Sequence, residues 1–269
     1  MKVIDIIKKN NLLTKKSLGQ NFLIDEVLLD KIANVAKIDK NSNILEVGSG
    51  PGGLTYSILK QNPEKLVSIE LDDRCFNILK EEFHSYKNFR IINSDALNID
   101  ESLYFDKKIK VIANLPYNIG TALILKWLNS IDLFEDFTLL LQKEVVERIV
   151  AKPGNKDYGR LSVIVQAFCE AKKVFDIKPT SFLPPPKVMS SVIYIKSREA
   201  RDINSINIKK LEYITFSLFN QRRKKIKQSI LKLMYDGKID EDVLNLFDMD
   251  KRAEELEVYE FILLSNKLK

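Results

Sequence analysis

The chain has 269 residues, which is long enough for one large domain and a smaller second one. Hydrophobic residues make up 45% of it and charged residues 30%, a composition that excludes disordered, collagen-like and low-complexity chains. The 43 basic residues outnumber the 37 acidic ones, and the net charge of +6 favours polyanionic partners such as nucleic acid, whereas two cysteines and one histidine are too few for the usual zinc clusters or disulfide frameworks.

The N-terminal segment lacks the features of a targeting or membrane sequence. Residues Met1 to Lys9 have no long apolar stretch and no small-residue cleavage site, and charges interrupt every later hydrophobic run before it reaches membrane-spanning length. We therefore expect a cytoplasmic protein without membrane contact. Thr14–Ile24 is polar and contains glycine, which predicts a loop or arm ahead of a helix over Asp25–Lys37.

From Asn41 to about Lys196, short apolar runs alternate with stretches of helical period. This alternation predicts an α/β domain with a mostly parallel, Rossmann-like sheet. The predicted strands are 44–47, 66–69, 89–92, 110–113, 137–141, 161–165 and 188–195. After Ser197 the sequence becomes charged and helix-favouring, so we expect a first domain over residues 1–199 and a small all-α domain over 200–269.

Ligands of doubly wound sheets bind beyond the carboxyl ends of the strands, so the residues that follow each strand are informative. The first predicted strand runs into a loop in which Gly48, Gly50 and Gly53 fit the G-x-G-x-x-G pattern, typical of a nucleotide-type ligand at a helix N-terminus. The second strand ends in Glu70, placed to accept hydrogen bonds from ribose hydroxyls, or else a structural acid. Asp95 after the third strand fits an acceptor for an adenine amine and equally a helix N-cap.

The fourth predicted strand ends in Asn114-Leu115-Pro116-Tyr117. Proline restricts its own backbone and that of the residue before it, so this turn is stiff and holds the Asn114 amide and the Leu115 carbonyl in fixed directions. Two acceptors beside an aromatic ring suit a flat base with an exocyclic amine, on whose face Tyr117 stacks. A proline turn with a packed tyrosine explains the same residues except the asparagine.

These residues resemble the S-adenosylmethionine-dependent rRNA adenine N6-dimethyltransferase family, and within it the branch that modifies small-subunit (16S) rRNA. The likeness covers nearly the whole chain. Its motifs are Lys16-Ser17-Leu18-Gly19-Gln20-Asn21-Phe22-Leu23, Leu45-Glu46-Val47-Gly48-Ser49-Gly50-Pro51-Gly52, Ile69-Glu70-Leu71-Asp72, Asp95-Ala96, Asn114-Leu115-Pro116-Tyr117-Asn118, Gly159-Arg160-Leu161-Ser162-Val163 and Phe182-Leu183-Pro184-Pro185-Pro186-Lys187-Val188.

The resemblance implies a methyltransferase fold, S-adenosylmethionine as methyl donor, and no metal. It implies cofactor contacts from Asn21, Leu23, Gly48, Glu70, Asp95 and Asn114. The catalytic residues it implies, together with the reading of the turn, are Asn114, Leu115, Pro116, Tyr117 and Phe182. Phe182 is a candidate for the second ring against the target adenine, and a core aromatic beside the last strand is the alternative.

A basic run follows in the helical part of the chain, from Gln221 to Lys227. We expect it on a helix whose apolar stripe includes Phe216, Phe219 and Ile226, with Arg222, Lys224 and Lys225 off the stripe and available to RNA phosphates.

The predicted function is dimethylation of two adjacent adenosines in a hairpin loop near the 3′ end of 16S rRNA, by a monomer acting on the small subunit or its precursor. A large-subunit (23S) enzyme of the macrolide-resistance type is an alternative with the same chemistry. A ribosome-assembly factor with secondary catalysis is another, although the intact Asn114 turn favours catalysis. A DNA or protein-glutamine methyltransferase fits less well, because Leu115 stands where an Asn-Pro-Pro-Tyr turn has proline.

Overall fold

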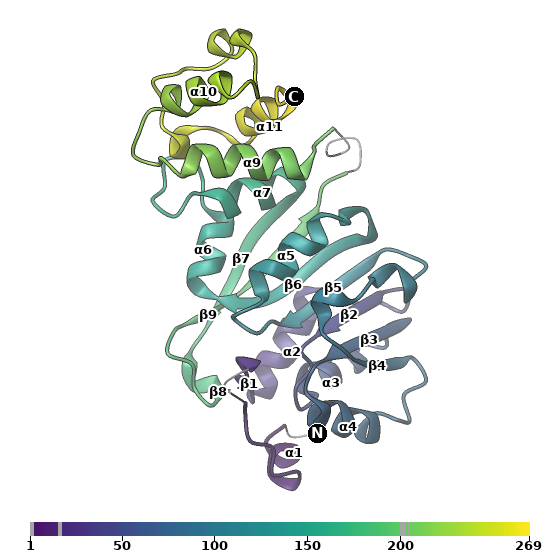
Figure 1. Cartoon of the computed structure of the whole chain (residues 1–269). Helices are drawn as coiled ribbons and strands as arrows, with labels where there is room; N and C mark the ends of the chain where they lie inside the picture. Colours follow the sequence, from purple (N-terminus) through teal and green to yellow (C-terminus); the bar gives the residue numbers. More distant parts are fainter. Residues whose placement is uncertain (1–2, 16–17, 200–202, 204) are drawn as a thin grey trace. The chain divides into compact units, whose positions relative to one another are not determined.

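The computed structural model describes residues 3–15, 18–199, 203 and 205–269, and these form two compact units. The first consists of Met1–Val146 and Lys172–Ser197, and the second of Glu147–Ala171 and Arg198–Lys269 (Figure 1). The sequence suggested a single division after residue 199. In the structure, Glu147–Ala171 instead groups with the C-terminal residues, so the chain passes between the two units more than once.

A seven-stranded sheet organises the first unit, with the strand order β4-β3-β2-β5-β6-β9-β7. Neighbours from β4 to β6 run parallel, and β9 is antiparallel to β6. This arrangement confirms the predicted Rossmann-like α/β class. The strands are β2 (Asn43–Val47), β3 (Lys65–Glu70), β4 (Phe89–Asn93), β5 (Ile109–Asn114), β6 (Phe134–Gln142), β7 (Cys169–Ile177) and β9 (Ser190–Ser197).

One predicted strand is wrong, and one strand of the seven-stranded sheet was missed. Leu161–Val165 lies in helix α7 (Arg160–Phe168), which begins where the Ser162 hydroxyl accepts a hydrogen bond from the Gly159 backbone N–H at 3.0 Å. A short apolar run buried on several sides has no period that separates strand from helix. Strand β7 was missed because its charged side chains alternate outward, as at a sheet edge.

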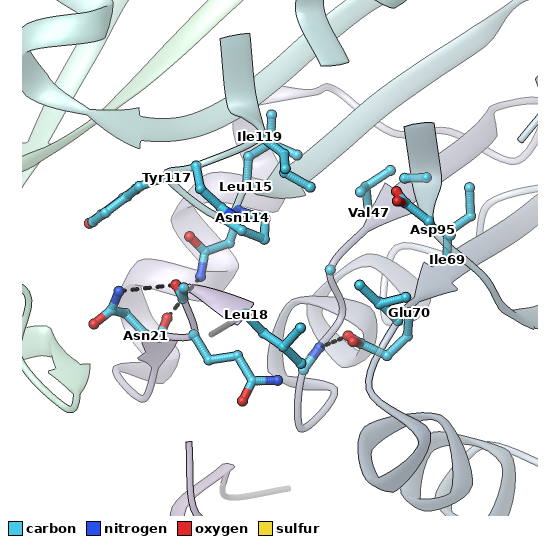
Figure 2. Close-up of a pocket in the computed structure, with 18 of the residues that line it drawn as sticks. Leu18, Asn21, Val47, Ile69, Glu70, Asp95, Asn114, Leu115, Tyr117 and Ile119 are labelled. Atoms are coloured by element: carbon cyan, nitrogen blue, oxygen red, sulfur yellow. Dashed lines mark hydrogen bonds between the residues drawn. The ribbon is translucent and has the colours of Figure 1, made fainter. Parts of the chain in front are cut away.

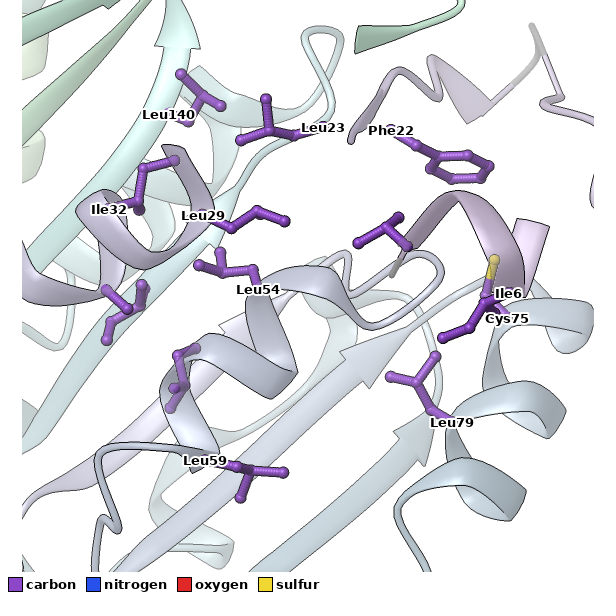
Figure 3. Close-up of a cluster of buried hydrophobic side chains, with 14 of the residues drawn as sticks. Ile6, Phe22, Leu23, Leu29, Ile32, Leu54, Leu59, Cys75, Leu79 and Leu140 are labelled. Atoms are coloured by element: carbon purple, nitrogen blue, oxygen red, sulfur yellow. The ribbon is translucent and has the colours of Figure 1, made fainter. Parts of the chain in front are cut away.

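Helices cover both faces of the sheet. Helices α1 (Val3–Lys9), α2 (Glu26–Val35), α3 (Gly53–Leu59) and α4 (Asp73–Glu82) contribute to one hydrophobic cluster together with Ile112 and Leu140 of the sheet (Figure 3). Phe137 lies on the opposite face, since it is paired with Val111 rather than Ile112, and its ring stacks on Trp127 of α5 (Gly120–Leu128) at 5.6 Å. The predicted helix after Asp25 is confirmed, with Asp25 as its N-cap.

The N-terminal arm is tied to the other end of the unit by a two-stranded pair. Strand β1 (Phe22–Leu23) lies antiparallel to β8 (Phe182–Leu183), with Leu23 opposite Phe182. Both side chains are buried in the hydrophobic cluster, at 4% and 2% exposure. Short 3₁₀ helices complete the chain: η2 (Ala96–Asn98), η3 (Glu101–Leu103), η4 (Ile131–Leu133), η5 (Pro179–Ser181), η6 (Glu241–Asn245) and η7 (Ala253–Glu255).

Beneath the glycine loop, β2 carries a buried carboxyl group. Glu46 is 1% exposed, and its Oε2 accepts hydrogen bonds from Thr55 Oγ1 at 2.7 Å and Ser68 Oγ at 2.5 Å, while Oε1 has no partner among the described residues. Burial raises the pKa of Glu46 to about 7, because the loss of solvation outweighs these two donors.

This carboxyl group should make the protein less stable as the pH rises. Between pH 4.5, the ordinary pKa of a glutamate, and about 7, the folded state binds a proton that the unfolded chain releases, so unfolding becomes easier by up to about 3 kcal/mol. Glu46→Gln should remove this part of the pH dependence of the free energy of unfolding, measured by urea unfolding at about pH 5 and about pH 8. The exposed Glu26→Gln is the control. An unchanged pH dependence in Glu46→Gln would contradict the assignment.

The second unit is helical, built around α7, α9 (Ile208–Phe219), α10 (Ile226–Tyr235) and α11 (Val258–Asn266), with α6 (Lys143–Val150) ending in it. Its core includes Phe261 and Tyr158, and the half-buried ring of Phe219 stacks on Phe261 at 5.5 Å and meets Tyr158 edge-on at 6.1 Å. The expected single helix through the basic run is wrong: residues 220–225 form a turn between α9 and α10.

Candidate functional site

A cavity of about 260 Å³ lies at the carboxyl ends of the parallel strands (Figure 2). Its wall is formed by the N-terminal arm and by the segments that follow β2, β3, β4 and β5. The lining residues are Leu18, Gly19, Gln20, Asn21, Phe22, Val47, Gly48, Gly50, Ile69, Glu70, Leu71, Ser94, Asp95, Ala96, Asn114, Leu115, Pro116, Tyr117, Asn118 and Ile119.

Most of the residues singled out from the sequence meet on this wall: Asn21, Gly48, Glu70, Asp95 and the turn from Asn114 to Tyr117. Leu23 and Phe182 do not. Both side chains lie in the hydrophobic core as partners in the β1–β8 pair, so a cofactor contact of Leu23 would be made by its backbone, and the Phe182 ring is too buried for the predicted stacking. The alternative considered for Phe182, a core aromatic, is the one observed.

The glycine loop lies close to the turn Asn114-Leu115-Pro116-Tyr117, called the acceptor turn below. Gly48 has a φ of +74°, and a Cβ there would lie 3.4 Å from Pro116 Cδ and 3.6 Å from the Asn114 carbonyl oxygen. Gly50 also has a positive φ, and its N–H donates to Glu70 Oε2 at 2.8 Å. A side chain at either position is strained, so glycine keeps this part of the wall open.

Glu70 is a buried acceptor on the cavity wall. Besides the Gly50 N–H, it accepts the Asp72 N–H on Oε1 at 2.9 Å. Burial raises the pKa of this carboxyl group, and the two backbone donors oppose that shift. Each carboxylate oxygen has a further lone pair, so Glu70 remains able to accept from a ligand hydroxyl.

Asp95 lies on the same side of the cavity as Glu70 (Figure 2). One of its oxygens accepts the Leu97 N–H at 2.9 Å and caps η2, so the cap expected as an alternative is present. This cap does not exclude a ligand contact, because the side chain also lines the cavity and keeps a second oxygen.

A lysine outside the cavity fixes the segment that carries Asp95. The Lys126 amine, on α5, donates to the carbonyls of Ala96 at 2.8 Å and Ile99 at 2.5 Å and pairs with Glu101 at 2.7 Å. Glu101 is buried and also accepts the indole N–H of Trp127 at 2.9 Å. Sequence reasoning missed Lys126 because two of its three partners are backbone carbonyls and the third, Glu101, is 25 residues away in the chain.

The acceptor turn lies across the cavity from Glu70 and Asp95 (Figure 2). The Asn114 amide nitrogen donates to the Asn21 carbonyl at 3.4 Å, which leaves its oxygen as an acceptor. The Leu115 N–H donates to the Leu140 carbonyl of β6 at 3.2 Å, whereas its own carbonyl accepts no hydrogen bond from the described residues. The turn thus presents two acceptors, held by the arm and by the sheet.

The arm is anchored by one buried carboxylate. Asp72 accepts hydrogen bonds from Arg74 Nη2 at 2.6 Å and Gln20 Nε2 at 2.9 Å, and it pairs with Lys15 at 3.4 Å. Arg74 also donates to the Leu13 carbonyl at 2.9 Å. The Arg74 guanidinium holds the pKa of Asp72 well below its usual range. Residues 16 and 17, which open the arm motif, lie outside the described part of the chain.

The family described as ribosomal RNA adenine dimethylase matches residues 11–269. The chain belongs to this family. Among its relatives, proteins named ribosomal RNA small subunit methyltransferase A are similar to this dimethylase over almost its whole length. That of Wolbachia pipientis subsp. Culex pipiens (strain wPip) is 42% identical, covering 97% of this chain and 99% of the relative. That of Mesorhizobium japonicum is 39% identical, covering 98% and 96%.

Solved structures agree on the fold of the dimethylase. A dimethyladenosine transferase from Plasmodium falciparum superposes with a TM-score of 0.76 at 27% identity, over 90% of this chain and 94% of that one. The 23S rRNA methyltransferase ErmE superposes with a TM-score of 0.68 over 92% of this chain and 99% of that one. At 23% identity, the likeness to ErmE is one of fold.

The family and its fold imply S-adenosylmethionine as methyl donor, and the cavity of the dimethylase fits such a molecule. Carboxylates suited to a nucleoside lie at one side, with the apolar side chains of Val47 and Ile69 beside them, and amide and carbonyl acceptors lie at the other. The missing Cβ of Gly48 keeps backbone accessible between the two sides.

Loss of the Lys126 amine should weaken cofactor binding although this residue does not line the cavity. In Lys126→Met the carbonyls of Ala96 and Ile99 lose a charged donor, so we expect the dissociation constant for S-adenosylmethionine to rise about tenfold in titration calorimetry. Lys107→Met, which removes an exposed pair with Glu64, is the control. Thermal melts check that both variants fold, and an unchanged dissociation constant in folded Lys126→Met would refute the expectation.

The basic run lies in the second unit, at the turn between α9 and α10. Arg222 pairs with Glu254 at 2.7 Å and Lys225 pairs with Asp250 at 2.7 Å, whereas the Lys224 side chain is exposed with no partner among the described residues. A shallow hollow beside them is lined by Arg223, Lys224, Lys225, Lys227, Gln228, Asp250, Arg252 and Glu255. The predicted phosphate contacts are thus on the surface, but two of the three side chains already have acidic partners.

Two further findings concern the described residues alone. None of their helices is both long and apolar enough to cross a membrane. No group of three or more His, Cys, Asp or Glu side chains in them is arranged to hold a metal ion.

Proposed function

We propose that this dimethylase transfers methyl groups from S-adenosylmethionine to the N6 amines of two adjacent adenosines, in a hairpin loop near the 3′ end of 16S rRNA. The observation that carries the proposal is the pair of acceptors at Asn114 and Leu115, which faces the cavity from the side opposite Glu70 and Asp95. The choice of RNA is supported by relatives named for the small subunit at 39–42% identity.

When bound, S-adenosylmethionine supplies a methyl group on a positively charged sulfur. Glu70 would accept from its ribose hydroxyls and Asp95 from its adenine amine, with Asn21, Gly48 and Asn114 contacting the remainder. The target adenine is harder to activate, because its N6 lone pair is delocalised into the ring and the amine is a poor nucleophile. The Asn114 side-chain oxygen and the Leu115 carbonyl accept the two N6 hydrogens, favour a pyramidal nitrogen and direct its lone pair into the cavity.

Methyl transfer to the N6 amine requires no general base with a shifted pKa. An amine nitrogen that gains an alkyl group becomes acidic, so its proton leaves to water or to Asn114. The chain's single histidine, His84, is exposed beyond the end of α4 and does not line the cavity. The second methylation makes a further demand, since the monomethylated amine keeps one hydrogen and must rotate or rebind with its methyl group beside the acceptors.

The proposal extends to RNA contact and to location. Lys224, with Arg222 and Lys225 beside it, would bind phosphates of the folded small-subunit RNA, and the second unit, Glu147–Ala171 with Arg198–Lys269, would form the RNA-contacting part. The protein would act as a monomer in the cytoplasm, linked to biogenesis of the subunit. The +6 charge supports a polyanionic partner.

Purified ribosomal subunits from a strain lacking the gene provide the test. Wild-type protein and labelled S-adenosylmethionine should place label on small subunits, and nucleoside mass spectrometry should identify N6,N6-dimethyladenosine at two adjacent positions. Label confined to large subunits would overturn the choice of RNA in favour of the 23S alternative. Full restoration of subunit assembly by an inactive variant would favour a binding role, and transfer only to DNA or protein would reject the proposal altogether.

A further inference from the structure

The phenol of Tyr117 is held by a buried hydroxyl from a distant part of the chain. Tyr117 Oη and Ser190 Oγ are 2.6 Å apart, in a hydrogen bond that either group can donate. Tyr117 is half-buried and lines the cavity, whereas Ser190 is 0% exposed and does not. The serine therefore meets the cavity only through the tyrosine.

The backbone around Ser190 is fixed by the sheet. Ser190 is the first residue of β9 and pairs with Gln142 at the end of β6. The preceding residue, Met189, accepts the Lys143 N–H on its carbonyl at 2.9 Å. The hydroxyl of Ser190 is thus a stationary partner, set by two neighbouring strands.

The Tyr117 ring is consequently attached at both ends. Its backbone follows Pro116 in a turn that the Leu115 N–H ties to β6, and its hydroxyl is tied to β9. Burial raises the pKa of Tyr117, so the phenol stays neutral and able to donate. A ring restrained at both ends has little freedom to rotate, so less entropy is lost when a base stacks on it.

Tyr117 is also the ring best placed to meet a base. Of the two aromatic residues on the cavity wall, Phe22 is buried, with its ring edge close to Gly50. Phe182 lies in the core. Stacking of the target base therefore depends on how the Tyr117 ring is oriented.

We propose that Ser190 is a positioning residue for the methyl acceptor: through its hydrogen bond to Tyr117 it sets the plane of the ring on which the target adenine stacks. This inference rests on the proposed function, since it assumes an adenine at the acceptor turn. It assigns to a residue of β9, far from the cavity motifs in the sequence, a role in RNA affinity rather than in cofactor binding.

The neighbouring serine is a matched control. Ser191 is also 0% exposed, but its hydroxyl donates to Asp176 at 2.6 Å, away from the cavity residues. Ser190→Ala and Ser191→Ala therefore remove the same atom from adjacent buried positions. In Ser190→Ala the half-exposed phenol can bond to water, so the fold should persist while the ring gains freedom.

The test measures kcat and KM for purified small subunits in Ser190→Ala, Tyr117→Phe and the double variant, with the affinity for S-adenosylmethionine measured separately by calorimetry. We expect Ser190→Ala and Tyr117→Phe each to lower kcat/KM five- to tenfold, mainly through KM, and the double variant to be no worse than either. Affinity for S-adenosylmethionine should stay within twofold, and Ser191→Ala should match wild type.

The outcomes separate the inference from the proposed function. With an active wild type, an unchanged Ser190→Ala, additive losses in the double variant, or an equal loss in Ser191→Ala would each overturn the role of Ser190 and leave the proposed function standing. A wild-type protein that methylates no adenosine would overturn both.

Discussion

Replacing Asn114 with alanine should lower the rate of methyl transfer about a thousandfold at saturating cofactor and RNA. The side-chain oxygen is one of two acceptors that would orient the N6 amine, and the loss of one preorganised polar group at a reacting centre typically costs about 3–4 kcal/mol in the transition state. The other acceptor, the Leu115 carbonyl, belongs to the backbone and survives the substitution. Single-turnover transfer of label to purified small subunits measures the effect.

Asn114→Asp separates the acceptor from the rest of the side chain. It keeps an oxygen at the same place but loses the amide donor to the Asn21 carbonyl, which is 3.4 Å away and contributes weakly. We therefore expect Asn114→Asp to retain clearly more activity than Asn114→Ala. Calorimetry with S-adenosylmethionine should show at most a modest loss of affinity in both. A rate for Asn114→Ala within tenfold of wild type would exclude an orienting role.

The sequence was most informative where a strand ends. Gly48, Glu70, Asp95 and Asn114 lie at or just after the carboxyl ends of four separate strands, and parallel strands place these ends at one edge of a sheet. Their convergence on one cavity therefore follows from the position of each residue at the end of its strand and does not depend on side-chain packing. The glycine pattern added the local conformation, because Gly48 and Gly50 do adopt positive φ.

Burial was the property that motifs did not predict. Leu23 and Phe182 belong to two motifs that carry the family resemblance, yet they lie opposite each other in the β1–β8 pair and their side chains are buried in the core. Which side of a two-residue strand faces a cavity depends on its pairing partner, and that partner lies about 160 residues away in the chain. A long-range pairing of this kind leaves no local periodicity to detect.

The contacts that hold the cavity residues in place could not be predicted from the sequence either. Lys126 binds backbone carbonyls, Asp72 binds side chains of the irregular arm, and Ser190 bonds to the phenol of Tyr117 in the turn after β5. In the sequence, nothing about Lys126, Asp72 or Ser190 as residue types distinguishes them from the lysines, aspartates and serines of a solvated surface. Their roles come from tertiary proximity, which composition and spacing do not encode.

Tyr117→Ala should lower kcat/KM for small subunits about a hundredfold and leave the affinity for S-adenosylmethionine unchanged. Stacking of a base on an aromatic side chain contributes about 1–3 kcal/mol, and the upper part of that range applies where the ring is restrained, as Tyr117 is by Ser190 at 2.6 Å. The measurement is steady-state methylation of purified small subunits, with calorimetry for the cofactor.

Tyr117→Phe distinguishes the ring from its hydroxyl. It keeps the stacking face, so it should retain at least a tenfold advantage over Tyr117→Ala, while its smaller deficit relative to wild type reports the bond to Ser190. If stacking is absent, the ring serves only to fill space beside the turn, and both variants should then change cofactor affinity and thermal stability in parallel with activity. Normal turnover in Tyr117→Ala would remove the ring from the mechanism and leave orientation of the adenine to Asn114 and Leu115 alone.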